Sequence, residues 1–278
     1  MIKIIDVDKL FDDYISDYVY KNIGNVKPEE IENKIPMLYE QFGNEKLKEL
    51  DNKTPNEYYK DYDIKELLTC LKNHLEKRVE VSDFLCEAIN AKVDDDAELV
   101  KALDNDEDEE FMLYVMNMLS DMGSKKCLKR YLEFILWDYS QVIRELATEN
   151  LVAFAQDVKE DVLAQFKEVS DEKKECLTEI LSNVKNDDRV FDILVAEFVR
   201  HGENVPVYAN YLAKYGDERA LPFLMTAIEK EKISYADFEE LRFAIEALGG
   251  SYDKERDFSH DKTFRKIRGE KKGANKLN

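Results

Sequence analysis

A repeat of about 30–33 residues in the second half of the chain constrains its fold more than any other feature of the sequence. The segment Gly216–Leu224 reads GDERALPFL, and the segment Asn186–Leu194 reads NDDRVFDIL. Each places a turn residue before two acids, an arginine, and a small residue followed by a large apolar one. Related starts near residues 123 and 155, with Gly249 closing the last unit, give four units. A unit of this length cannot bury its apolar face alone, so the repeat predicts stacking on neighbours.

Each unit divides into two helices. Serine capping signals at Ser140, Ser170 and Ser234 open the first, second and fourth of the second helices, and Pro206 stands in the opening turn of the third, near 203–215. Helical rather than alternating apolar spacing runs through almost every segment. Nine glycines and five prolines are too few for a barrel or sandwich of short strands. The sequence therefore predicts an all-α fold, a right-handed α-solenoid of stacked antiparallel helix pairs.

The last unit resembles a known family. YGDERALPFLMTAI followed by FEELRFAIEALGG is similar to the short bacterial HEAT-like repeat of the bilin-lyase type, with its Gly-Asp turn and Ala-Leu-Gly ending. The likeness is good over 215–250, fair over 119–154 and weak over 155–214. It implies an ARM-type superhelix and says little about activity, because one fold hosts many functions. The resemblance also implies that Arg144 and Arg242, on second helices, brace an acidic residue or loop carbonyls.

The chain divides into three parts. Residues 119–250 hold the four HEAT-like repeats, and residues 251–278 form a basic tail that we expect to be flexible. Residues 1–118 are helical in pattern without a clear repeat, and their Thr54-Pro55-Asn56-Glu57 segment is a capping box. They either continue the stack as degenerate pairs or cap it as a separate region. We favour continuation, because the same helix rhythm persists without a long linker.

Composition and processing signals point to a cytoplasmic protein. The N-terminus has acids in place of an apolar signal core, and no window approaches 18 uncharged apolar residues. The four cysteines, Cys70, Cys86, Cys127 and Cys176, are widely spaced, which favours buried free thiols in a reducing compartment over a disulfide or metal site. The net charge of −20 disfavours a nucleic-acid coat.

A search for catalytic constellations nominates no active site. The phosphate loop, GxGxxG, GxSxG and HExxH motifs are all missing from the sequence, and only three histidines occur. Carboxylate pairs are so abundant that no single pair is evidence for acid–base chemistry. We therefore expect no cofactor and no bound metal, and we expect a role other than catalysis.

Two features are candidates for binding. Tyr208, Tyr211 and Tyr215 share one face of the third second-helix beside Lys214, where aromatic side chains can anchor a peptide. The alternative is that these tyrosines pack between repeats. The only tryptophan, Trp137, is expected to pack in the core or between repeats.

The second candidate is the C-terminal tail. Residues 262–278 carry seven lysines and arginines against one acid, Glu270. The tail is either an arm for an anionic partner, including nucleic acid, or a solubilising segment that touches the protein's own acidic surface.

The leading hypothesis is a non-catalytic scaffold whose second helices line a groove for a protein or peptide partner with a basic patch. Its candidate contact residues are Tyr208, Tyr211, Tyr215, Lys214, Arg144 and Arg242. Electrostatic steering would favour such a partner, and no membrane contact is expected. The alternatives are a nucleic-acid-binding relative of the HEAT-like alkylpurine DNA glycosylases, or an enzyme like the bilin lyases.

Overall fold

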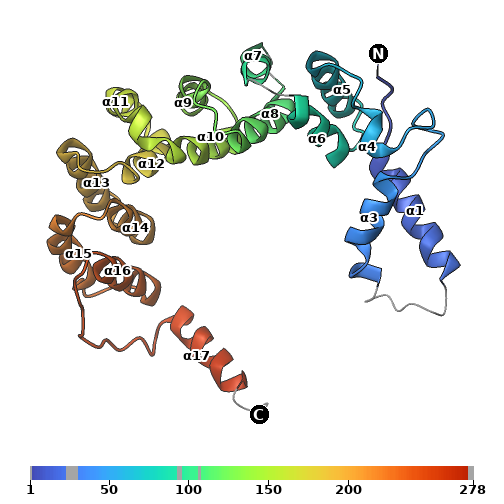
Figure 1. Cartoon of the computed structure of the whole chain (residues 1–278). Helices are drawn as coiled ribbons and strands as arrows, with labels where there is room; N and C mark the ends of the chain where they lie inside the picture. The colour runs from blue at the N-terminus through green and yellow to red at the C-terminus, as the bar shows by residue number, and fades with distance from the viewer. Residues whose placement is uncertain (1, 23–30, 93–95, 106–107, 275–278) are drawn as a thin grey trace. The chain divides into compact units, whose positions relative to one another are not determined.

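The computed structural model describes residues 2–22, 31–92, 96–105 and 108–274. Within these ranges the regular structure is helical apart from one isolated bridge between Leu47 and Lys53, which confirms the all-α prediction. No helix in these ranges is both long and apolar enough to cross a bilayer. The chain forms two compact units, Met1–Cys127 and Leu128–Asn278, both of which are drawn in Figure 1.

The first unit is built from helices of unequal length. They are α1 (Val7–Lys21), α3 (Ile35–Gly43), α4 (Pro55–Tyr58), α5 (Ile64–Glu76), α6 (Asp83–Lys92), α7 (Ala97–Asn105) and α8 (Glu109–Asp121). The Thr54 side chain makes no capping bond to the four-residue α4, whereas Asp63 and Glu66 form a reciprocal capping box on α5. Asp63 therefore starts the long helix, and the Thr54 signal opens only a single turn.

An aromatic cluster forms part of the core of the first unit. The ring of Phe42 on α3, which is fully buried, lies 5.2 Å from Phe11 and 5.6 Å from Tyr14 of α1. Phe84 of α6 lies 6.2 Å from Phe42 and 5.0 Å from Tyr39. Tilted and stacked ring pairs at these separations add to the burial energy, and they join segments far apart in the sequence.

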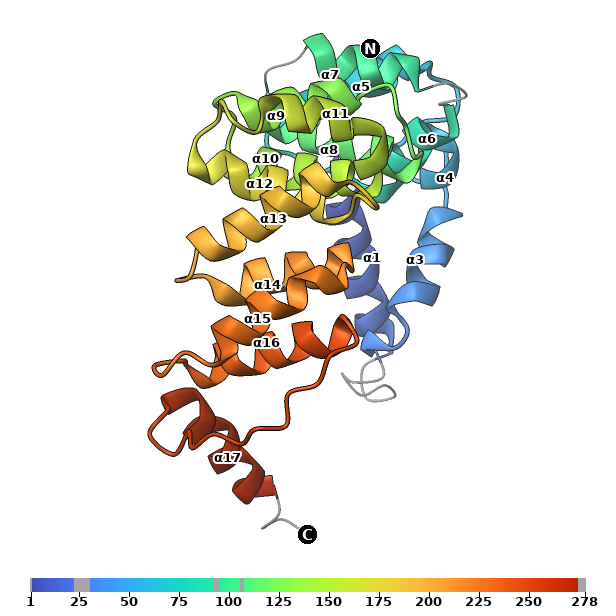
Figure 2. The same cartoon turned by 90° about the vertical axis from the view of Figure 1, so that its left-hand side faces the viewer.

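The second unit consists of helix pairs in chain order. They are α9 (Leu128–Leu136) with α10 (Gln141–Ala153), α11 (Ala155–Gln165) with α12 (Asp171–Ser182), α13 (Asp188–Arg200) with α14 (Val205–Tyr215), and α15 (Leu221–Ile228) with α16 (Tyr235–Ala247). Ser140, Ser170 and Ser234 are the N-cap residues of α10, α12 and α16, as the sequence predicts. The second helices also pack on one another in the order α10, α12, α14 and α16, and Figure 2 shows α14 and α16 running side by side.

The turns between pairs explain the strength of the repeat pattern. Asn186, Gly216 and Gly249 all adopt a positive φ, with values of 56°, 81° and 81°. This left-handed conformation ends a helix and favours glycine or asparagine, so these residues stand out in the sequence. At the α10–α11 junction Phe154 has a φ of −119° and α11 follows at once. That junction needs no special turn residue, which is why the repeat is weak near residue 155.

An Asp-x-Arg motif links successive pairs of the second unit. The carboxylate of Asp187 accepts bonds from the backbone N–H and the guanidinium of Arg189, and Arg189 also donates to Glu160 at 2.7 and 3.0 Å. Asp217 and Arg219 repeat this arrangement, and there Arg219 reaches Asp188 at 2.8 Å. Each arginine thus joins its own turn to an acid 29 or 31 residues earlier.

A further contact at this separation lies in the first unit. Asp96, at the start of α7, accepts a hydrogen bond from Ser124, 28 residues later, and pairs with Lys126. The turn that holds Ser124 begins at Gly123, where φ is again positive at 62°. The repeat-type contact therefore extends back to α7 and α8.

Two sequence-based expectations differ from the structure. Trp137 is 53% exposed, because Tyr131 and Phe134 already occupy the buried face of α9 and Trp137 lies just past its end. The basic tail is not wholly irregular, since Lys262–Ala274 form helix α17. Phe264 holds this helix by packing its ring 5.0 Å from Tyr235 of α16, a contact that the charge of the tail hides in the sequence.

Candidate functional site

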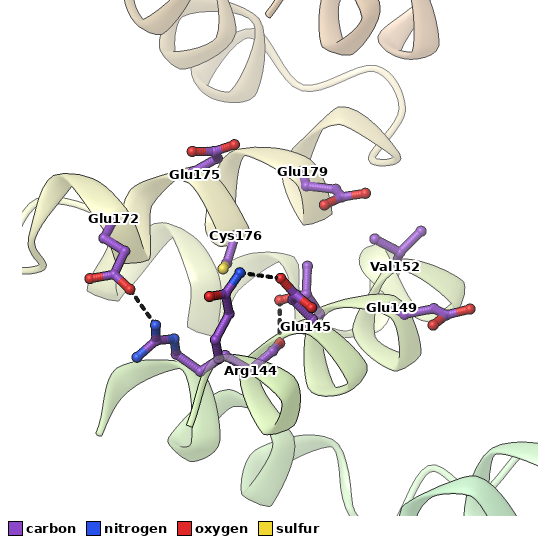
Figure 3. Close-up of a pocket in the computed structure, with 10 residues that line it drawn as sticks. Arg144, Glu145, Glu149, Val152, Glu172, Glu175, Cys176 and Glu179 are labelled. Carbon is purple, nitrogen blue, oxygen red and sulfur yellow. Dashed lines mark hydrogen bonds and ion pairs between the residues drawn. The ribbon is translucent and has the colours of Figure 1, made fainter. Parts of the chain in front are cut away.

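A groove of about 610 Å³ lies between two second helices, α10 and α12, which pack side by side. Figure 3 shows the side chains that line it. They are Gln141, Arg144, Glu145, Thr148, Glu149, Val152, Glu172, Glu175, Cys176 and Glu179. We call this surface the α10–α12 groove.

Helical periodicity decides which side chains line the groove. On α10, Ile143, Ala147 and Leu151 recur every four residues and are fully buried in the core. Glu145 and Glu149, which are offset by two positions, point away from that face and are exposed. On α12, Leu177 and Ile180 are buried in the same way, and the remaining face turns to the groove. The groove is thus the polar side of two amphipathic helices.

The charge of the groove is strongly unbalanced, with five glutamates and one arginine. That arginine, Arg144, is already engaged: its guanidinium pairs with Glu172 and donates to the backbone oxygen of Tyr139 at 3.1 Å. An acid and a loop carbonyl are the two kinds of partner that the HEAT-like resemblance implies at this position. Because Arg144 is paired with Glu172, its positive charge does not neutralise the other four glutamates of the groove.

Those four glutamates are Glu145, Glu149, Glu175 and Glu179. Glu145 accepts a hydrogen bond of 2.6 Å from the neutral side chain of Gln141. Within the part of the chain that the structure describes, no ion pair involves any of the four. Glu145 and Glu149 are one turn apart, as are Glu175 and Glu179, so their charges repel one another along each helix. A cationic group placed in the groove would relieve that repulsion.

The floor of the groove is uncharged. The Thr148 hydroxyl donates to the backbone oxygen of Arg144 at 2.7 Å, which satisfies this buried polar group. Burial raises the pKa of the Cys176 thiol, so it stays protonated at neutral pH and is a poor nucleophile. Val152 adds an apolar contact at one end. This lining suits contact with the aliphatic stem of a basic side chain better than it suits covalent chemistry.

The three candidate tyrosines are packed inside the second unit. Tyr208 is only 3% exposed, and its ring stacks on His201 at 4.7 Å. Burial raises its pKa to about 12. The Tyr215 hydroxyl accepts from the Asp187 N–H and donates to the Asp187 carbonyl, both at 2.9 Å. Tyr211 is likewise buried, so none of the three rings is offered to a partner.

The remaining candidates lie outside the groove. Lys214 is exposed near the end of α14, and its backbone oxygen accepts a hydrogen bond of 2.7 Å from Lys185. Arg242 on α16 bonds Glu239 at 2.8 Å and lies 3.8 Å from Glu246, so it is engaged within its own helix. Of the six residues singled out from the sequence, only Arg144 lines the α10–α12 groove.

Sequence reasoning passed over the groove glutamates. In the sequence, these glutamates are marked by the one-turn spacing of acids on two successive second helices. The chain has 61 aspartates and glutamates, so this spacing does not single them out. Among the described residues, no cluster of three or more His, Cys, Asp or Glu side chains is arranged to hold a metal ion. No protein-family model, curated protein or solved structure matches the chain.

Proposed function

We propose that the second unit is a HEAT-like α-solenoid, a right-handed superhelix of the ARM type. Contacts between neighbouring helix pairs support this proposal because they recur at a nearly constant separation. Arg144 pairs with Glu172, Arg200 with Asp171 and Arg219 with Asp188, at separations of 28, 29 and 31 residues. Stacked repeats of constant length give contacts of this kind, since each unit meets only its neighbours.

In this proposal the protein is a non-catalytic, cytoplasmic interaction scaffold. Its α10–α12 groove binds a basic segment of a protein partner, such as a helix that presents lysine or arginine every three or four residues. The observation that carries the proposal is the surplus of glutamates around one already paired arginine. Opposite charge accelerates encounter and selects the partner, and the uncharged floor accommodates the stems of its side chains.

The charge of the groove also indicates which class of partner, nucleic acid or protein, it can bind. Nucleic acid would bring phosphates against Glu145, Glu149, Glu175 and Glu179, and this repulsion is unfavourable. A basic protein segment meets the same residues as counter-charges. The groove therefore favours a protein partner over a nucleic acid.

A charge-reversal experiment tests this assignment. The probe is a fluorescent helical peptide with lysines at every fourth position, and its affinity is measured by anisotropy at low salt. The variant is Glu149→Lys with Glu175→Lys, which reverses one charge on each wall of the groove. The matched control is Asp161→Lys with Asp192→Lys, two exposed acids on α11 and α13 that lie outside the groove.

The expected result is a loss of affinity of about tenfold or more for the groove variant, since two attractions become repulsions. The control makes the same change in net charge and should stay within about twofold of the wild type. Equal losses in both variants would mean that the peptide responds only to net charge, and the groove would not be the site.

A further inference from the structure

The C-terminal helix α17 is the most basic element of the second unit. One side of it packs on α16, and a cationic side remains exposed to solvent. Asp261 caps the helix by accepting from the N–H groups of Thr263 and Phe264, at 2.8 and 3.0 Å, and from the N–H of Tyr235 at 3.2 Å. The ring of Phe264 packs on Tyr235 and lies 6.3 Å from Phe258. These contacts fix one side of α17 against α16.

The exposed side of α17 carries Lys262, Arg265 and Lys266, at spacings of three and four residues. Arg265 donates to backbone oxygens of its own cap, those of His260 and Asp261. Among the side chains that the structure describes, which end at Arg268, neither Lys262 nor Lys266 has an ion-pair partner. The first turns of α17 therefore present a row of cations to solvent in a molecule whose net charge is −20.

We propose that α17 of one copy of this protein docks in the α10–α12 groove of a second copy. This inference rests on the proposed function of the groove and names its occupant. Lys262 and Lys266 are four residues apart, as are Glu145 and Glu149 on one wall and Glu175 and Glu179 on the other. Four residues rise about 6 Å along any α-helix, so a helix lying along the groove can match its cations to both rows of acids.

The order of the helices makes this contact intermolecular. Within one copy α17 packs on α16, α16 packs on α14, and α14 packs on α12. Figure 2 shows α14 and α16 lying between α17 and α12. While Phe264 holds α17 in place, the helix does not reach the groove of its own copy. Helix and groove are different surfaces, so the contact is head to tail and can add further copies beyond a dimer.

Sedimentation velocity of the full chain over a series of concentrations tests the proposal. We expect the wild type to associate at low salt and to dissociate at high salt, because the contact is largely electrostatic. Lys262→Glu with Lys266→Glu should weaken association by about tenfold or more, as should Glu149→Lys with Glu175→Lys. The decisive protein carries all four substitutions. It exchanges the charges of helix and groove and should associate again.

The control Asp161→Lys with Asp192→Lys should associate like the wild type. A wild type that stays monomeric at every concentration, or a four-fold variant that fails to recover, would overturn the proposal. If the wild type is monomeric while the lysine peptide still binds the groove, self-docking fails and the proposed function stands. If the wild type stays monomeric while a double-stranded oligonucleotide binds it, and Lys262→Glu with Lys266→Glu abolishes that binding, α17 serves a nucleic acid and self-docking is refuted.

Discussion

The two units of the chain use different kinds of contact between distant residues. In the first unit, Lys3 pairs with Asp51 and the His74 ring lies 3.3 Å from the backbone oxygen of Ile5, across 48 and 69 residues. In the second unit, ion pairs join neighbouring helix pairs at separations close to 29 residues. Apart from the repeat-type contacts of Asp96 next to α7, the first unit therefore depends on a few contacts that are made once, and the second depends on contacts that recur.

This difference teaches how each unit should respond to damage. An aromatic core that gathers α1, α3 and α6 loses several contacts when one ring is removed. In the second unit, ion pairs join successive helix pairs. A substitution there removes one ion pair, and the neighbouring pairs remain. Substitutions in the core of the first unit should therefore cost more stability than substitutions in the ion pairs of the second.

The largest effect is expected from Phe42→Ala in the first unit. The side chain is fully buried among Phe11, Tyr14 and Phe84, so its removal leaves a cavity. We expect a loss of about 3–5 kcal/mol in the free energy of unfolding, measured by urea titration. Hydrogen exchange should show the loss of protection in α1, α3 and α6.

The matched control for this substitution is Phe243→Ala on α16, where the ring is 63% exposed. Its loss should be no more than about 0.5 kcal/mol, because little apolar surface leaves a packed environment. Similar losses in the two variants would contradict the assignment of Phe42 to a critical core.

A smaller loss is expected from Tyr215→Phe in the second unit. The substitution keeps the packed ring and removes the hydroxyl that bridges the N–H and carbonyl of Asp187. Leaving these backbone groups without that partner should cost about 1–2 kcal/mol in urea unfolding. A neutral result would mean that water replaces the hydroxyl and that this contact does not bind one repeat to the next.

Low pH should reduce the stability of the second unit by protonating the aspartates that pair with arginines at the junctions between helix pairs. Hydrogen bonds from Arg200, Arg189 and Arg219 lower the pKa of Asp171, Asp187 and Asp217, respectively, below the ordinary value of 3.8. A lowered pKa means that these carboxylates stabilise the fold above the ordinary value, and the stabilisation is lost as the pH falls through the folded value.

The measurement compares the wild type with a variant that has asparagine at all three positions. Urea unfolding followed by circular dichroism should give a more stable wild type at neutral pH, with a difference that shrinks below about pH 4. A difference that is constant with pH would contradict the role of these charges.

Much of the second unit could be predicted from the sequence because its local signals agree with one another. Ser140 and Ser234 cap the helices that they are predicted to cap, Ser170 stands at its predicted N-cap position without a side-chain bond, and Asn186 and Gly216 mark turns with a positive φ. In the first unit, Thr54 and Asp63 both stand at N-cap positions, but only the Asp63 side chain accepts a bond from the helix that it opens. The charged residues of the tail predict a flexible segment. The sequence does not indicate that one ring, Phe264, is enough to pack α17 against α16.

The smallest effect is expected from the loss of one arginine that joins successive helix pairs of the second unit. Arg189→Gln removes the guanidinium that bonds Asp187 and Glu160; the Arg189 and Glu160 side chains are exposed, and the largely buried Asp187 keeps its ion pair with Lys159. Exposed ion pairs contribute little, so the melting temperature should fall by no more than roughly 2–4 °C. A fall as large as that of Phe42→Ala would erase the contrast between the two units.

The candidate site was less accessible to sequence reasoning than the fold. The spacing of Tyr208, Tyr211 and Tyr215 predicts that they share one helix face, but periodicity alone does not say whether that face is covered. The structure buries it against neighbouring helices, and the exposed face belongs to Glu145, Glu149, Glu175 and Glu179. Which side of a helix remains open depends on how the next repeat packs, and that is a property of the tertiary structure.

The salt dependence of peptide binding to the α10–α12 groove tests the central claim most directly. The lysine peptide is titrated into the wild type and into Glu149→Lys with Glu175→Lys, from low to high salt. We expect tight binding to the wild type at low salt, weakening by about tenfold or more at high salt, and weak binding to the variant throughout. Binding that is indifferent to salt, or equal in the two proteins, would contradict it.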